Sequence, residues 1–148
     1  MFQQRCKLAE KTNILELNNF SIKTIPPDVF THPFLNTLDL SANDVSRVPL
    51  EIQKLVRLRK LRLNHNLLVR FPPVLLRLNT LTSLFLNHNH LQSIPEKICQ
   101  LSLLQKLDCS VNQVCLNFHL FDFFFRFFFL SVLYLVYASM YLSSWCGS

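Results

Sequence analysis

Three histidines are the residues of this 148-residue chain best suited to metal chemistry. His65 and His88 each stand in an Asn-His-Asn triplet, and His90 follows two residues after His88. Imidazole nitrogens are preferred zinc ligands, so three of them brought together could bind zinc. The triplet also recurs where a loop simply tolerates polar residues. We therefore favour solvated histidines and expect no metal site.

The most basic stretch of the chain is the segment 54–62, which contains five cations. Clustered lysines and arginines can contact phosphates, which makes nucleic acid a conceivable partner. An alternating strand pattern would divide these side chains between two faces, and no series of aromatic residues accompanies them to stack on bases. We expect a solvated charged surface, with attraction to an anionic membrane as an alternative, and we disfavour nucleic acid. The cations are Lys54, Arg57, Arg59, Lys60 and Arg62.

The composition excludes several classes of enzyme. Gly147 is the single glycine, so neither a dinucleotide-binding fingerprint nor a Walker phosphate loop can be formed. No H-E-x-x-H motif and no nucleophile elbow occurs, and no paired carboxylates converge. The sequence therefore predicts no catalytic site, no cofactor and no small-molecule substrate.

The cysteines and the N-terminus bear on the compartment. The number of cysteines is five, and no two of them form a C-x-x-C motif, so neither a disulfide framework nor a zinc knuckle is indicated. Residues 1–7 are polar and have no apolar stretch behind them, so we expect no secretory signal peptide. We expect a reducing compartment and a cytoplasmic protein.

The strongest signal in the sequence is repetition at a step of 23 residues. Units begin near residues 12, 35, 58, 81 and 104, and the last unit is incomplete. A full unit has leucines in the spacing L-x-x-L-x-L, followed in register by an asparagine and by an apolar residue before a proline. We expect a repeat domain over 12–115, preceded by an N-terminal lead-in over 1–11.

This pattern resembles the L-x-x-L-x-L-x-x-N pattern of leucine-rich repeat proteins. The later spacing P-x-x-I-x-x-L, as in Pro49, Ile52 and Leu55, looks like the intracellular class of repeats of about 23 residues. Small cytosolic scaffolds, including Ras-pathway scaffolds, carry that class. The resemblance implies an α/β solenoid with short parallel strands on a concave side and irregular, 3₁₀ or helical segments on a convex side. It also implies an adaptor or scaffold that binds a protein.

Elementary chemistry supports the same architecture. The two leucines of L-x-L lie on one face of a strand, and units must stack because none can bury its leucines alone. A buried asparagine amide can satisfy turning backbone groups, which predicts a structural ladder. Its members are Asn43, Asn66, Asn89 and Asn112. Phe20 replaces the asparagine of the first unit, which predicts a capping unit, and Cys109 replaces an inward leucine, which predicts a buried thiol.

The residues between the inward leucines should face solvent on the concave side, where partners dock. Arg62 and Phe85 form the kind of pair that is enriched in protein interfaces. We predict a partner site centred on Arg62, Phe85 and His88. The residues expected around them are Lys60, Leu67, Asp108, Asp39 and His65.

The segment 116–148 differs sharply from the repeats. It contains eight of the fourteen phenylalanines, all three tyrosines and two charged residues, Asp122 and Arg126. Residues 127–146 are uncharged and mostly apolar, about the length of a transmembrane helix. With Arg126 on the near side, the repeats would face the cytosol.

Three interpretations of this hydrophobic, helix-compatible tail remain open. It is a membrane anchor, a translated stretch of non-native coding sequence, or a cap on the open end of the solenoid. They lead to three functions: a protein-binding adaptor or scaffold, a tail-anchored protein that displays its repeats to the cytosol, and a truncated isoform of a longer repeat protein without an independent role. The partner is a protein in the first two.

Overall fold

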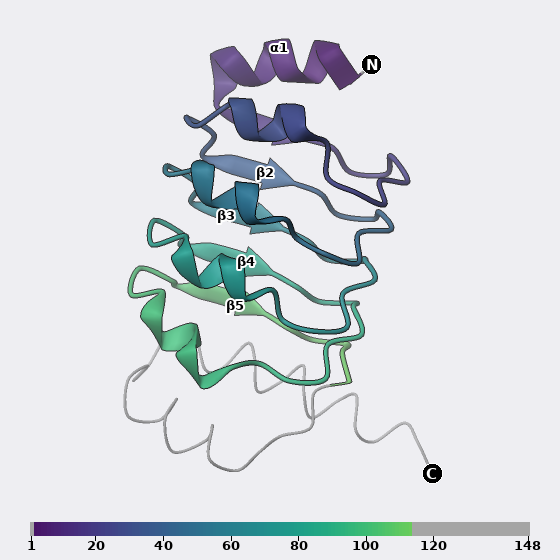
Figure 1. The fold of residues 1–148 in the computed structure, drawn as a ribbon, viewed down its shortest axis with the longest axis vertical. Coiled ribbons are helices and arrows are strands. Elements are labelled where there is room, and N and C mark those ends of the chain that lie inside the picture. The colour runs from purple at the N-terminus through teal and green to yellow at the C-terminus, as the bar shows by residue number, and fades with distance from the viewer. Residues whose placement is uncertain (1, 114–148) are drawn as a thin grey trace.

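The computed structural model describes residues 2–113, which form a stack of five repeated layers behind one N-terminal helix (Figure 1). Helix α1 spans Phe2–Thr12. Five strands of three residues each follow along the chain. They are β1 (Ile14–Glu16), β2 (Thr37–Asp39), β3 (Lys60–Arg62), β4 (Ser83–Phe85) and β5 (Lys106–Asp108).

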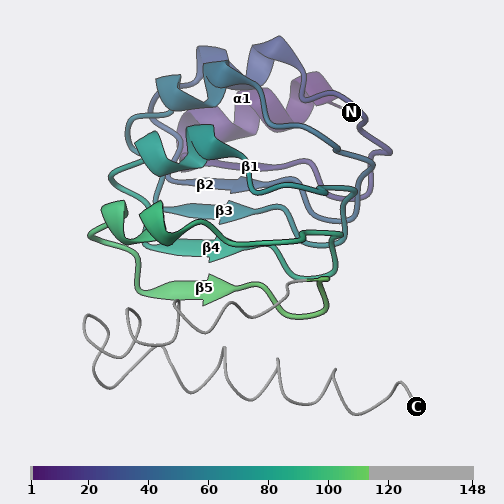
Figure 2. The ribbon, with the colours of Figure 1, turned by 60° about the horizontal axis from the view of Figure 1, so that its bottom comes forward.

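The five strands form one parallel sheet in the order in which they occur in the chain (Figure 2). Every strand pairs with the next at an offset of one repeat, so that Leu38 aligns with Leu61 and Leu61 with Leu84. Because the register equals the sequence period, equivalent side chains of all units form straight columns across the sheet. The predicted solenoid of short parallel strands is confirmed.

Four 3₁₀ helices lie on the side opposite the sheet, one after each of the first four strands (Figure 1). They are η1 (Pro27–Thr31), η2 (Leu50–Lys54), η3 (Pro73–Arg77) and η4 (Glu96–Gln100). Each follows a proline in extended conformation, at positions 26, 49, 72 and 95. Proline fits there because its φ angle is fixed and its missing N–H falls before the helix needs a donor.

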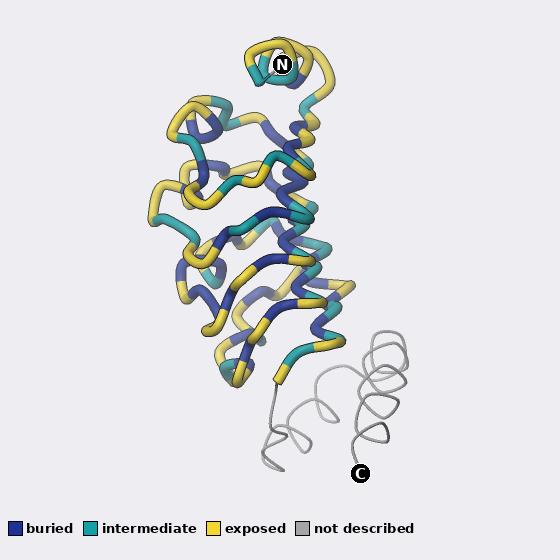
Figure 3. Tube along the Cα trace, turned by 90° about the vertical axis from the view of Figure 1, so that its right-hand side faces the viewer, coloured by how far each residue is buried: buried dark blue, intermediate teal, exposed yellow. Residues whose placement is uncertain are grey.

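The core is a continuous set of leucine columns between the sheet and the 3₁₀ helices. Leu38, Leu61 and Leu84 are fully buried, as are the leucines two residues later in each unit. Cys109 occupies this second column with 4% of its surface exposed, so the predicted buried thiol is confirmed. The buried residues, dark blue in Figure 3, run through all layers of the stack. Because each layer packs against its neighbours, the apolar surface is removed from water only in the stacked state.

A ladder of asparagine side chains joins the layers just beyond the strands. The Asn66 amide Nδ2 donates to the Leu40 carbonyl of the preceding layer at 2.9 Å and to Leu63 at 3.1 Å. Its Oδ1 accepts the backbone N–H of Val45 at 2.9 Å. Asn43, Asn89 and Asn112 make equivalent hydrogen bonds.

Helix α1 covers the N-terminal end of the stack, within the residues that the sequence marks only as a lead-in. Ala9 is buried, and Phe2 and Cys6 pack partly against the core. Arg5 donates to the Glu16 carbonyl at 2.6 Å, and its guanidinium lies 5.1 Å from the centre of the Phe20 ring. The helix shields the first leucine layer from water.

The predicted tail, including the candidate membrane span 127–146, lies outside the described residues. Within residues 2–113, no helix is both long and apolar enough to cross a bilayer.

Replacing Asn66 by alanine should destabilise the fold strongly. The substitution leaves the buried Val45 N–H without its acceptor, which costs about 1–3 kcal/mol. It also removes one of the two amide donors from the Leu40 carbonyl and from the Leu63 carbonyl, which keep only Asn43 and Asn89. We expect the free energy of unfolding to fall by about 3 kcal/mol, measured by urea denaturation followed by circular dichroism. The control is Asn79, which is exposed. Asn79→Ala should change the free energy of unfolding by less than about 0.5 kcal/mol. Equal effects of the two substitutions would contradict the role of the ladder.

The buried thiol of Cys109 should make stability depend on alkaline pH. Burial, with a smaller contribution from the Asp108 carboxylate, raises the pKa of Cys109 from the ordinary 9.0 to about 12. The folded state therefore holds this proton more tightly, and the resulting stability is complete below pH 9.0 and lost as the pH rises toward 12. The urea midpoint of the wild-type chain should fall more steeply over this range than that of Cys109→Ala. Parallel pH profiles would rule the effect out.

Candidate protein-binding face

The outward side chains of the five strands form the sheet face, which is the predicted concave side. One column contains the last residue of each strand: Glu16, Asp39, Arg62, Phe85 and Asp108. The neighbouring column contains the first residue: Ile14, Thr37, Lys60, Ser83 and Lys106. The chemistry of this face is therefore set by residues that are one or two repeats apart in the sequence.

Phe85, on β4, lies at the centre of three cations that come from the two flanking strands, β3 and β5. The Lys106 ammonium is 5.0 Å from the ring centre, the Arg62 guanidinium carbon 5.6 Å and the Lys60 ammonium 5.8 Å. All three distances are within the range of cation–π attraction, about 0.5–1 kcal/mol each where exposed. The ring is partly buried. We call these four residues the Phe85 cluster.

Lys106 is a member of the Phe85 cluster that the predicted site leaves out. It stands in the same column as Lys60, two repeats later, so the 23-residue period contains the signal that would have identified it. Apart from the Arg62–Asp39 pair, the described residues contain no ion pair. Within the part of the chain that the structure describes, the ammonium groups of Lys60 and Lys106 therefore have no carboxylate partner.

Asp39 differs from the prediction that it faces solvent. The residue is 6% exposed, because its carboxylate is held between two neighbours. Oδ2 pairs with the Arg62 guanidinium at 3.1 Å, and Oδ1 accepts the Ser41 hydroxyl at 2.6 Å and the Ser41 N–H at 2.9 Å. Asp39 thus positions Arg62 and offers little surface of its own to a partner.

Asp108 repeats half of that arrangement. Its Oδ1 accepts the hydroxyl of Ser110 at 2.7 Å and the Ser110 N–H at 3.1 Å. Phe85 of the preceding strand stands beside Asp108 in register, whereas Arg62 belongs to the strand that follows Asp39. Among residues 2–113 Asp108 has no cationic partner, and its partly exposed carboxylate marks an acidic margin of the cluster.

His65 and His88 stack on each other next to the sheet face. Their ring centres are 4.1 Å apart, and their planes differ by 11°. Both residues have a φ angle of 53°, the left-handed conformation that histidine adopts more readily than most residues. Within residues 2–113, no group of three or more histidine, cysteine or acidic side chains is arranged to hold a metal ion. The stack is an exposed aromatic surface.

Leu67 belongs to a different surface from the one predicted for it. It is 44% exposed and lines a groove formed with the segments around Val48 and Val69. None of the four residues of the Phe85 cluster lines that groove. The side chain follows the asparagine of the ladder, where the chain has already turned away from the sheet.

Two family models match the chain, both for the leucine-rich repeat. The first matches residues 10–68 and the second matches residues 80–101. Together they cover more than half of the sequence. The chain is a leucine-rich repeat protein. Domains of this family generally mediate protein–protein interactions and are typically not enzymes.

Solved structures of leucine-rich repeat proteins resemble this domain. The BIR2 ectodomain from Arabidopsis thaliana is 32% identical, with a TM-score of 0.59, over 66% of this chain and 54% of that one. The leucine-rich repeat domain of APL1B is 25% identical, with a TM-score of 0.67, over 78% and 36%. A leucine-rich repeat protein of Leptospira interrogans is 25% identical, with a TM-score of 0.62, over 76% and 34%.

The chain thus spans about half of the BIR2 ectodomain and about a third of the other two proteins. No match was found among curated proteins.

The pairing of Asp39 with Arg62 should appear as a coupling energy. Because the carboxylate is buried and the guanidinium is half-exposed, the pair lies between surface and buried ion pairs in strength. We expect a coupling of about 1 kcal/mol in a double-mutant cycle of Asp39→Ala and Arg62→Ala, measured by urea denaturation. Asp108 has the same serine partner geometry but no arginine partner among residues 2–113. The cycle of Asp108→Ala with Arg62→Ala should therefore be additive within about 0.5 kcal/mol, and equal coupling in both cycles would refute the pairing.

Proposed function

We propose that this leucine-rich repeat domain is a protein-binding module of the adaptor or scaffold type. The partner is an acidic segment of another protein, bound on the sheet face. The observation that carries the proposal is the Phe85 cluster, in which one partly buried aromatic ring is surrounded by three cations. Aromatic residues and arginine are the side chains that most often dominate binding energy at protein interfaces.

The electrostatics of the cluster favour an anionic partner. Lys60, Arg62 and Lys106 approach the same ring, so their like charges repel one another, and only Arg62 has a carboxylate partner among the described residues. A partner carboxylate between Lys60 and Lys106 would relieve that repulsion and lose water in a partly apolar setting. Charge complementarity of this kind mainly raises the association rate and the specificity.

The carboxylates at the margins of the sheet face already have hydrogen-bond partners within the domain. Asp39 and Asp108 are bonded to their serines, and the histidine stack extends the aromatic surface beyond the ends of β3 and β4. The predicted contacts are therefore Phe85, Arg62, Lys60 and Lys106 at the centre, with His65, His88 and Asp108 around them. Asp39 contributes by holding Arg62.

For the place of action we propose the cytosol. The repeat length and the P-x-x-I-x-x-L spacing support the intracellular class of leucine-rich repeats, and Ras-pathway scaffolds are one model for such a role. The uncharged segment 127–146 supports a second form of the proposal, in which the same repeats are displayed to the cytosol from a membrane. A truncated isoform of a longer repeat protein would retain the sheet face and its chemistry.

The test places a photoreactive amino acid at two positions of the full-length chain in cells. Ser83 lies between Lys60 and Lys106 in its column on the sheet face, whereas Lys97 is exposed on η4. We expect a discrete cross-linked partner from position 83 and none from position 97. Phe85→Ala should reduce that product at least about fivefold, because it removes the apolar anchor and the cation–π contacts together.

The control is Phe34→Ala, which removes an exposed phenylalanine that is not in the sheet. It should leave the cross-linked product unchanged. Equal products from positions 83 and 97, or a product insensitive to Phe85→Ala, would contradict a partner site on the sheet face. Carbonate extraction of the same cells distinguishes the cytosolic form of the protein from the membrane-anchored one.

A further inference from the structure

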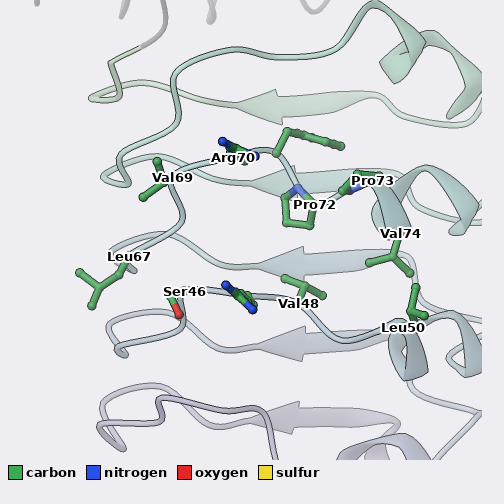
Figure 4. A pocket seen from close by; sticks show the side chains of 11 residues that line it. Ser46, Val48, Leu50, Leu67, Val69, Arg70, Pro72, Pro73 and Val74 are labelled. Carbon is green, nitrogen blue, oxygen red and sulfur yellow. The ribbon is translucent and has the colours of Figure 1, made fainter.

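A second surface with its own chemistry lies between two neighbouring return segments, on the way from the asparagine ladder to the 3₁₀ helices. It is a groove of about 830 Å³ between residues 46–50 and residues 67–74 (Figure 4). Eight of its eleven lining residues are apolar, and the others are Ser46, Arg47 and Arg70. The volume is in the range of sites that hold a few side chains of a ligand.

The groove exposes three aliphatic side chains to solvent. Leu50 is 64% exposed, Val69 45% and Leu67 44%. These side chains come from both walls: Figure 4 shows Leu50 on one segment and Leu67 and Val69 on the other, which also carries Pro72 and Pro73. Contiguous apolar surface of this kind marks interaction sites in soluble proteins.

The two walls are held together less tightly than the next pair of return segments. The Gln92 N–H donates to the Val69 carbonyl at 3.2 Å and so joins that pair. The equivalent groups one repeat earlier are the Val69 N–H and the Ser46 carbonyl, and among the described residues they form no hydrogen bond. A donor and an acceptor of the backbone are therefore available beside the apolar surface.

The charges at the groove have one sign. Arg47 and Arg70 are both exposed, and neither has a carboxylate partner among residues 2–113. No acidic residue lines the groove. An occupant that carries carboxylates would therefore be attracted, and one that carries lysines or arginines would be repelled.

We propose that this groove binds an extended peptide segment of a partner protein in which apolar and acidic side chains alternate. The apolar side chains fill the space over Leu50, Leu67 and Val69, and the acidic ones pair with Arg47 and Arg70. In an extended peptide, successive side chains point to opposite sides and the backbone groups stay free. The peptide backbone can therefore bond to the Val69 N–H and the Ser46 carbonyl, as in other modes of strand recognition.

This site is independent of the proposed sheet-face function, because the two surfaces share no residue of the Phe85 cluster. The test uses the full-length chain and two fluorescent peptides of about eight residues, one alternating Leu and Glu and the other alternating Leu and Lys. Fluorescence anisotropy should show saturable binding of the Leu–Glu peptide and none of the Leu–Lys peptide.

Charge reversal at the groove gives the decisive comparison. The double variant Arg47→Glu, Arg70→Glu should lower the affinity for the Leu–Glu peptide by at least about tenfold. It should bind the Leu–Lys peptide instead. Arg57→Glu is the matched control, since Arg57 is exposed and does not line the groove. It should leave both affinities unchanged.

Three outcomes would overturn the proposal. The first is equal binding of the two peptides, or binding insensitive to charge reversal at Arg47 and Arg70. The second is loss of Leu–Glu binding in Phe85→Ala with no loss in Val69→Ser, which would assign the peptide to the sheet face. The third is a dimer in sedimentation velocity that Leu50→Asp dissociates, which would assign the groove to a second copy of the chain.

Discussion

The hydrogen bonds of the buried asparagine ladder are the constraint on which the rest of this structure depends. Each amide of the ladder bonds to carbonyls of its own layer and of the preceding one, and accepts an N–H in return. These groups sit where the chain turns away from the sheet and no strand partner is available. An unsatisfied buried amide is costly, so the ladder fixes the offset between layers at one repeat. The straight columns of the sheet face follow from that offset.

The columns explain how a domain without a catalytic motif acquires a specific surface. Lys60, Phe85 and Lys106 are separated by at least 21 residues in the sequence, yet they meet because their strands are adjacent. The same geometry places Arg62 over Asp39, which is bonded to Ser41 and holds the guanidinium toward the ring. Binding chemistry in this fold is a property of neighbouring repeats. The effect of a substitution on one strand therefore depends on the side chains of the adjacent strands.

Where the sequence predictions went wrong, the cause was a contact that no repeat pattern contains. Asp39 was expected in solvent because alternation assigns it outward, but an ion pair and two hydrogen bonds from Ser41 bury its carboxylate. Leu67 was expected beside Phe85, yet the turn after the strand directs it into the groove. Helix α1 was missed because its period is not that of the repeats and the residues it buries are few, chiefly Ala9.

The sequence by itself determined the period, the strands, the buried leucines, the asparagines of the ladder and the prolines before the 3₁₀ helices. These features are local and repeat in phase, so each unit reports the same packing requirement. Only the tertiary structure decided the burial of Asp39, the meeting of three cations at Phe85 and the groove between residues 46–50 and 67–74. These features depend on side-chain distances and backbone hydrogen bonds between layers. Such distances are set when unlike side chains of neighbouring layers stack, so a single repeat does not encode them.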